Sequence, residues 1–321
     1  MELITGENDN GRRLDRILRK AMPDHSLALI HRLLRQGKIF VNGEPAKAQD
    51  RLVAGVKITI PSLKDTLKQA ACGFNQKIRL SQNTISPLQI IWEGSGLLAV
   101  NKPPGIAVHG RDSLDTAVRS FLADKLPPSL SFKPGPLHRL DKPSSGIIVF
   151  SANIEGARLF TYLIRERKVR KIYLTIVEGT VKNEEIWQDT LIRDKEKKKT
   201  YRCLAPLGKT AITKVFPLAA NGKYSLIQAE IVTGITHQIR AQAAAHGYPL
   251  TGDVKYKTRE TSLHNANDSI ADFFLHAWKL EFLEYSIEAP IPKSFREKIK
   301  ELFGELNYIS LDKITASKTE T

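Results

Sequence analysis

HRLDKPSSG, residues 138–146, places an acid beside two bases on a turn that leads straight into the apolar run at 147–150. The run has the length and branching of a buried strand. A turn at the edge of a strand can present a side chain to a cleft, because the strand holds the backbone in place. We therefore expect Asp141 to lie in a site built on a rigid element.

The whole chain is basic, with 49 Lys and Arg against 34 Asp and Glu in 321 residues and a formal net charge of +15. Such a balance indicates a polyanionic partner, although an inert basic surface is the plain alternative. No long basic amphipathic helix points to a membrane surface, so nucleic acid is the favoured partner. The length predicts two domains.

The cysteines and the N-terminus suggest a cytoplasmic protein. Cys72 and Cys203 stand in unrelated contexts and form no disulfide framework. The first residues are polar and lack the apolar core of a signal peptide. No segment approaches 18 consecutive apolar residues, so we expect no membrane span.

Residues 1–61 are expected to form a small unit of two helices and short strands. Apolar residues at helical spacing predict a helix that ends before Pro23, and a second helix begins near Ser26 with Gly37 as its C-terminal cap. Strands are expected at 39–41 and 57–60, with a tight turn at Asn42-Gly43.

Both helices carry basic outward faces. The bases recur at helical spacing: Arg12, Arg16 and Arg19 on the first helix, Arg32 and Arg35 on the second, and Lys38 just beyond it. Solvated helix faces are the plain alternative, but backbone phosphates are the natural partner for bases that converge in this way. The stretch GRRLDRILRKAMPDHSLALIHRLLRQGKIFVNG (11–43) resembles the S4 RNA-binding domain, although Leu27 stands where many S4 domains carry arginine. The resemblance gives these RNA-binding candidates: Arg13, Arg16, Arg32, Arg35, Lys38 and Asn42.

The rest of the chain predicts a linker at 62–86, a second domain at 87–302 and a polar tail at 303–321. Strands are expected at 88–92, 97–101, 106–108 and 147–150, an alternating strand at 171–178, and a hairpin of 210–218 with 224–232. Helices are expected at 114–125, 153–166 and 236–246. Hairpins with inserted helices indicate the α+β class, with a mixed, largely antiparallel sheet flanked by helices.

Several chemistries have no motif in this sequence. It contains no phosphate-binding GxxxxGK[ST] loop, no GxGxxG after a strand and no GxSxG elbow. Its histidines show no metal-ligand spacing. We expect a site without nucleotide cofactor or metal, built from carboxylate, guanidinium, hydroxyl and aromatic groups.

Asp141 is the candidate nucleophile or base, with a simple turn-forming role as the alternative. Arg139 lies two residues away, and Arg240 lies on the helix opened by TGIT (233–236). A guanidinium within roughly 4–6 Å would keep the carboxylate ionised and orient it. Tyr173 is expected on the polar side of its strand, where its ring could stack on a base and its hydroxyl could move a proton.

Four motifs in order resemble the RluA-type pseudouridine synthases: HRLDKPSSG, KIYLTIVEG, TGITHQIRAQAAAHGYPLTGDVKY and FLHAWKLEF, within residues 88–290. The resemblance implies isomerisation of uridine in RNA without cofactor or metal. It implies that Asp141 is the essential aspartate and that Arg240 pairs with it. It further implies that Tyr173 stacks on the target base and that Arg139 fills the space that the flipped uridine leaves. Ile235 departs from the family pattern, which has arginine there, and Ser144 replaces a threonine.

The S4-like unit favours an enzyme of 23S rRNA. We expect a monomer, because nothing in the sequence demands a larger assembly. Two alternatives stay open, namely a non-catalytic rRNA-binding assembly factor and a synthase that acts on tRNA. The sequence does not choose between attack of Asp141 on C1′ and removal of the C2′ proton, nor does it identify the target uridines.

Overall fold

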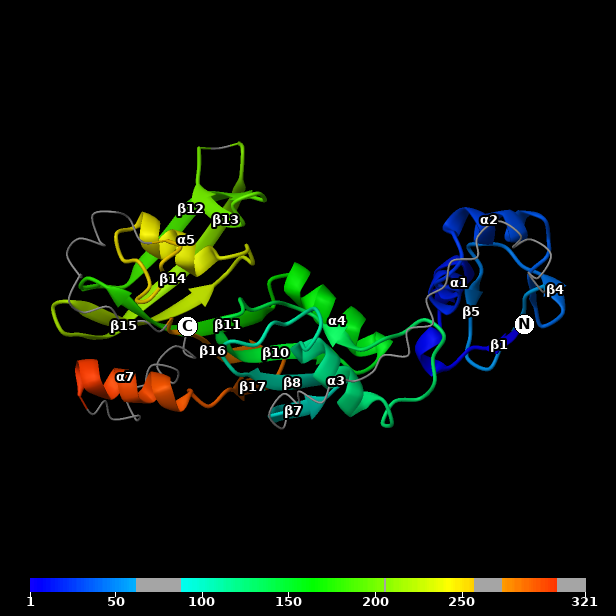
Figure 1. Ribbon diagram of the computed structural model, residues 1–321, viewed down its shortest axis with the longest axis horizontal. Coiled ribbons are helices and arrows are strands. Elements are labelled where there is room, and N and C mark those ends of the chain that lie inside the picture. The colour runs from blue at the N-terminus through cyan, green and yellow to red at the C-terminus, as the bar shows by residue number, and fades with distance from the viewer. Residues whose placement is uncertain (62–87, 205, 257–272, 305–321) are drawn as a thin grey trace.

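The computed structural model describes residues 1–61, 88–204, 206–256 and 273–304. These residues form a small N-terminal unit and a larger sheet domain (Figure 1). The linker expected at 62–86, and all but the first two residues of the tail expected at 303–321, lie outside the described residues. Within the described part, no helix has the length and apolar character needed to cross a membrane.

The small unit combines two helices with short strands. Its strands pair in the order β1-β6-β3-β4, and β2 pairs with β5. The elements are β1 (Glu2–Ile4), η1 (Glu7–Asp9), β2 (Arg12–Arg13), α1 (Leu14–Ala21), α2 (Leu27–Arg35), β3 (Phe40–Val41), β4 (Glu44–Pro45), β5 (Arg51–Leu52) and β6 (Lys57–Thr59).

Local sequence signals account for the ends of α2. The Ser26 hydroxyl accepts a hydrogen bond from the backbone N–H of Leu29, as an N-cap does. At the other end, Gly37 has a positive φ of 64°, and the N–H groups of Gly37 and Lys38 bond back to the last turn. This is the Schellman arrangement that favours glycine. The expected helix, its cap and the helix before it are confirmed.

The sheet domain is built on one large mixed sheet. The strands follow the order β13-β12-β14-β15-β11-β16-β10-β8-β7, with β17 on β16 and β9 on β10. The elements are β7 (Ile90–Gly94), β8 (Leu97–Lys102), α3 (Leu114–Leu122), β9 (Gly135–Pro136), β10 (Ser145–Ser151), α4 (Ile154–Arg165), β11 (Val169–Glu178), β12 (Glu185–Asp194), β13 (Lys199–Arg202), β14 (Lys209–Ala220), β15 (Tyr224–Ile231), α5 (Gln238–Ala245), β16 (Leu275–Phe282), β17 (Tyr285–Glu288) and α7 (Lys293–Phe303).

Strand β10, which follows the HRLD turn, lies between β8 and β16. It runs parallel to β16 and antiparallel to β8, so the expected mixed, largely antiparallel sheet is confirmed. Gly146 has a φ of 106°, and a Cβ atom there would lie 2.2 Å from the carbonyl oxygen of Ala277. Only glycine permits this close approach of the two strands.

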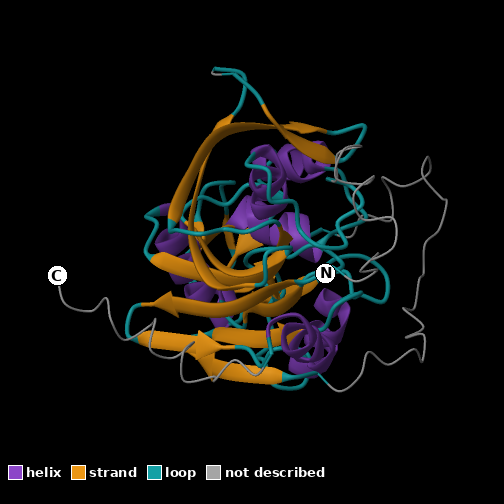
Figure 2. Ribbon diagram, turned by 90° about the vertical axis from the view of Figure 1, so that its left-hand side faces the viewer, coloured by secondary structure: helices purple, strands orange, loops and turns teal. Residues whose placement is uncertain are grey.

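Helices cover both faces of the sheet (Figures 1 and 2). On one face, α4 and α5 pack on the side chains of β10 and β11 that include Val149 and Val177. On the other, α3 and α7 pack on the alternate side chains, such as Ile148 and Ile176. Both strands are therefore buried on both faces, which explains the continuous apolar run of β10.

Two expectations about strands are wrong. Residues 106–108 form no strand, because the carbonyl groups of Ala107 and Val108 accept hydrogen bonds from the first residues of α3. The face of β11 that carries Tyr173 is not a polar, solvated face, because α5 covers it. Strands β12, β13, β16 and β17 and helix α7 were not identified from the sequence.

Candidate active site

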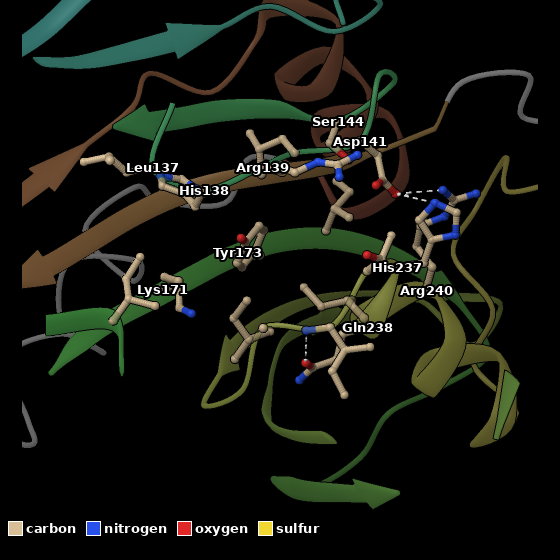
Figure 3. Close-up of a pocket in the computed structure, with 18 residues that line it drawn as sticks. Leu137, His138, Arg139, Asp141, Ser144, Lys171, Tyr173, His237, Gln238 and Arg240 are labelled. Atoms are coloured by element: carbon tan, nitrogen blue, oxygen red, sulfur yellow. Dashed lines mark hydrogen bonds and ion pairs between the residues drawn. The ribbon is translucent and has the colours of Figure 1, made fainter. Parts of the chain in front are cut away.

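A pocket of about 350 Å³ opens on the face of the sheet that α4 and α5 cover (Figure 3). The HRLD turn forms one wall, and the segment from Gly234 to Arg240 forms another. Tyr173 and Lys171 of β11 and Ile164 of α4 complete the lining. The pocket thus joins segments that are about 100 residues apart in the sequence.

Asp141 meets Arg240 in this pocket. Arg240 donates a hydrogen bond from Nη1 to Oδ2 of Asp141 at 2.8 Å. Its other two nitrogens bind Asp253, Nε to Oδ2 at 2.6 Å and Nη2 to Oδ1 at 2.7 Å. The bidentate bond fixes the plane of the guanidinium, so Arg240 holds Asp141 from a rigid position. The expected pairing of Arg240 with Asp141 is present in the structure.

Aromatic rings enclose the Arg240 guanidinium. Its central carbon lies 5.0 Å from the ring centroid of Tyr256 and 4.8 Å from that of Phe273. Burial lowers the pKa of Arg240, but the hydrogen bonds and charges of Asp253 and Asp141 outweigh it, so the pKa is raised overall. Arg240 is therefore a permanent cation that binds two carboxylates, that of Asp141 in the pocket and that of the buried Asp253.

His237 lies on the same side of Asp141. Its Nε2 is 3.6 Å from Oδ2 of Asp141, and its Nδ1 is 2.9 Å from the hydroxyl of Tyr256. Burial, followed by the charge of Arg240 and other bases, lowers the pKa of His237 to about 4, although Asp141 acts in the opposite direction. The imidazole is neutral at pH 7, so it contributes hydrogen-bonding capacity to the site without a second positive charge.

Lys102 anchors the turn that carries Asp141. Its ammonium is buried and donates to the carbonyl oxygens of Pro103, Ile106 and Lys142 at 2.8–3.0 Å. Burial lowers its pKa to about 8, while the charge of Asp141 raises it. Lys102 is the last residue of β8, so these bonds tie the loop at 103–106 and the carbonyl of Lys142, the residue after Asp141, to the end of this strand.

Tyr173 presents its ring to the pocket from β11, next to Lys171 in Figure 3. Only 7% of the residue is exposed. Burial and the charge of Asp141 raise the pKa of Tyr173, and burial lowers the pKa of Lys171. Tyr173 is therefore a neutral phenol at pH 7, placed to contact a planar group in the pocket.

The structure distributes the other candidate residues over separate surfaces. Arg139 is exposed and lines the pocket. Arg13 and Arg16 line a second cavity, between the small unit and α4. The remaining candidates are exposed on the small unit outside both cavities: Arg32, Arg35, Lys38 and Asn42.

Sequence reasoning assigned no role to several residues that shape the site. His237 and Asp253 belong to motifs that carried the family resemblance, so their place in THQIR and GDVKY is the signal that could have found them. Tyr256 is the last residue of the same GDVKY motif, whereas Lys102 and Phe273 lie outside the motifs and give no such signal in a single sequence. Ile235, which replaces the family arginine, lines the pocket and packs beside Tyr256. Among the residues described, none of the histidine, cysteine and acidic side chains gather in groups of three that could hold a metal ion.

Comparisons with known proteins identify the class of enzyme to which this fold and pocket belong. The family profile described as RNA pseudouridylate synthase matches residues 96–245, and that of the S4 domain matches residues 12–62. The chain is 30% identical over 287 residues to the ribosomal large subunit pseudouridine synthase C of Vibrio vulnificus, which covers 89% of each chain. The ribosomal large subunit pseudouridine synthase D of Neisseria meningitidis is 28% identical, over 88% of this chain and 76% of that protein.

A solved structure supports the fold. Human RNA Pseudouridylate Synthase Domain Containing 4 aligns with 67% of this chain and 92% of its own, with a TM-score of 0.55 and 23% identity. The chain belongs to the RNA pseudouridylate synthase family and is an isomerase that acts on RNA. An N-terminal S4 domain precedes the family core.

Proposed function

We propose that the protein converts specific uridines to pseudouridine in 23S rRNA of the large ribosomal subunit, with Asp141 as the catalytic carboxylate. The observation that carries this proposal is the Asp141–Arg240–Asp253 chain of hydrogen bonds in a pocket that also contains Tyr173. The similarity to large-subunit synthases over nearly the whole chain supports the choice of RNA.

The reaction is an isomerisation, so atoms and electrons balance within the nucleotide. The C1′–N1 bond breaks, the uracil turns, a C1′–C5 bond forms, and the proton lost from C5 is balanced by the one gained at N1. The target uridine must first leave the stack, which costs a few kcal/mol and least in a loop. A pocket of about 350 Å³ is of a size for one base.

Asp141 starts the reaction in either of two ways. Its carboxylate attacks C1′ as a nucleophile, or it removes the C2′ proton as a base. In both routes Arg240 acts as a positioning residue, because it donates to the carboxylate without needing to touch the base, and His237 lies beside it with Nε2 3.6 Å from Oδ2 of Asp141. Arg240 donates to Oδ2 of Asp141, which leaves Oδ1 for the ribose.

We assign Tyr173 the role of contacting the uracil while it turns in the pocket. Its raised pKa keeps the phenol protonated, which favours stacking on the uracil and a hydrogen bond over direct removal of the C5 proton. A water beside the hydroxyl can carry that proton away. Arg139, exposed beside the pocket, takes the space in the RNA that the flipped uridine leaves.

The RNA substrate also meets the S4 domain. Arg13, Arg16, Arg32, Arg35, Lys38 and Asn42 are the proposed contacts to phosphates. The net charge of +15 suits a long polyanion. We assign the activity to a monomer in the cytoplasm, where precursor rRNA is available. The isomerisation described above has no step that uses a nucleotide cofactor or a metal ion.

Deletion of the gene tests the substrate assignment. Pseudouridines are mapped chemically in 23S rRNA and in tRNA from the deletion strain, from the parent strain and from the strain complemented with the wild-type gene. We expect one or more sites in 23S rRNA to disappear on deletion and to return on complementation. Loss of sites in tRNA alone would overturn the rRNA assignment, and unchanged maps of both RNAs would overturn the proposed function.

A further inference from the structure

A cavity rich in arginine lies between the small unit and the sheet domain, remote from the pocket of Asp141. It has a volume of about 370 Å³. Four of its lining arginines belong to the small unit and one, Arg158, belongs to α4 of the sheet domain. The cavity is lined by Gly11, Arg12, Arg13, Arg16, Arg51, Ile154 and Arg158.

The two domains are fixed to each other beside this cavity by Asp9. Its carboxylate is fully buried and accepts hydrogen bonds from the hydroxyls of Ser129 and Ser131 and from the backbone N–H groups of Leu130 and Ser131. Burial raises the pKa of Asp9, but these hydrogen bonds and that of the Gly6 N–H lower it overall.

Two further contacts bind the small unit to the same part of the sheet domain. The Asn8 side chain accepts a hydrogen bond from the N–H of Ile154, the first residue of α4, at 3.0 Å. Leu130 packs against the apolar core of the small unit. The position of the small unit relative to α4 is therefore specified by a buried polar contact and an apolar one.

The arginines of the cavity repel one another. Burial lowers the pKa of Arg12, the charge of Asp9 raises it, and the smaller effects of the Arg158 and Arg16 charges lower it. Asp15 pairs with Arg13 at 2.7 Å, and Arg51 donates to the carbonyl oxygen of Gly11. Arg16 and Arg158 form no ion pair with any carboxylate of the described residues. Positive charges gathered in this way are stabilised by an anion from outside the protein.

Helix α4 contributes residues to the lining of both this cavity and the pocket of Asp141. Ile154 lines the arginine cavity and Ile164 lines the pocket. Ten residues of helix span about 15 Å, which matches about four nucleotides of a stacked strand. Arg158 and Arg165 are both exposed and lie seven residues apart on the same face of α4, and Arg165 pairs with Glu166 at 3.0 Å.

We propose that the arginines of the two domains form a single composite site for RNA phosphates, which holds the strand a few nucleotides from the uridine that enters the pocket. This inference rests on the proposed function, because it takes the RNA substrate as the polyanion. The inference adds that α4 of the sheet domain binds RNA phosphates together with the S4 domain. The buried Asp9 contact keeps the two halves of the site together.

Binding measurements test this site without any use of catalysis. Deproteinised large-subunit rRNA is titrated with the full chain by filter binding at several KCl concentrations. The variants are Arg158→Ala, Arg158→Lys and Arg16→Ala, and Arg296→Ala is the matched control on α7, at the opposite end of the molecule (Figure 1). Arg158 and Arg296 are both exposed, so neither change disturbs the core.

We expect Arg158→Ala and Arg16→Ala each to lower the affinity about 3- to 10-fold and to reduce the slope of log K against log [KCl] by about one. Arg158→Lys should keep the slope, and Arg296→Ala should match the wild type. An Arg158→Ala protein that behaves like Arg296→Ala, while Arg16→Ala loses affinity, would confine the site to the small unit and overturn the proposal. Pseudouridine mapping is read separately, so a failure of the proposed activity is not confused with this result.

Discussion

Arginine is placed in opposite ways in the two basic regions of this molecule. In the pocket, the Arg240 side chain is 8% exposed and binds two carboxylates between two aromatic rings. In the cavity beside the small unit, Arg16 and Arg158 are exposed, and no carboxylate of the described residues pairs with them. The first arrangement fixes the geometry of an acid. The second leaves positive charge available for an anion.

The comparison predicts that the same substitution has unequal effects on folding. Arg240→Ala should lower the free energy of unfolding by about 3–5 kcal/mol, because it leaves the buried Asp253 carboxylate without its main partner. Arg158→Ala should change it by less than about 0.5 kcal/mol, because the side chain is exposed. Urea unfolding of both variants measures the difference, and equal destabilisation would contradict the contrast.

Arg240→Lys sharpens the same test. Lysine keeps the charge but cannot form the bidentate bond with Asp253. We expect a protein more stable than Arg240→Ala that still isomerises RNA poorly, because Asp141 is no longer held. Wild-type turnover by the Arg240→Lys protein would show that a positive charge alone is enough to keep Asp141 active.

The next largest effect is expected on the isomerisation rate when the aromatic ring of Tyr173 is removed from the pocket. Tyr173→Ala should slow single-turnover isomerisation about 10- to 100-fold, since base–aromatic stacking is worth about 1–3 kcal/mol. Tyr173→Phe keeps the ring and loses the hydroxyl, so its loss should be much smaller. Equal losses in the two variants would instead give the hydroxyl the main role.

The sequence anticipated the parts of this account that depend on local patterns. Apolar spacing located α1, α2 and α3, and the apolar run after the HRLD turn located β10. The pairing of Asp141 with Arg240 followed from motifs with a family resemblance. Long-range packing accounts for the misses. Nothing local in β11 shows that α5 covers the Tyr173 face, and nothing in residues 8–9 shows that they bind residues 129–131 and 154.

Stability should also depend on pH through the sheet domain. His276 is fully buried between Ser145 and the Ala289 carbonyl, and burial lowers its pKa to about 4. Between pH 4 and 6.5 the unfolded chain binds a proton that the folded chain does not. The free energy of unfolding should therefore rise with pH across this window, by at most about 1.4 kcal/mol per pH unit from this residue.

Urea unfolding from pH 4 to 7 measures that slope, and NMR titration of His276 measures its pKa directly. His276→Asn removes this titrating group and should reduce the slope, while the contributions of His237 and His138, whose pKa values are also lowered, to about 4 and about 3, stay in place. An unchanged slope in this variant would assign the pH dependence to other groups.

The smallest effect is expected on the exposed face of α2. Arg32→Glu combined with Arg35→Glu should weaken rRNA binding about tenfold, because two phosphate contacts are replaced by repulsion. The free energy of unfolding should stay within about 0.5 kcal/mol of the wild type. Filter binding and urea unfolding provide both values, and unchanged affinity would remove α2 from the RNA contacts.

The central claim is that the carboxylate of Asp141 performs the isomerisation and does not serve to hold the RNA. Asp141→Asn keeps the shape of the side chain and removes its charge. Single-turnover assays on one 23S rRNA transcript, with binding measured in the same samples, separate chemistry from affinity. We expect RNA binding within about twofold of the wild type and isomerisation slower by about 1,000-fold or more. Isomerisation at the wild-type rate by the Asp141→Asn protein would contradict the account.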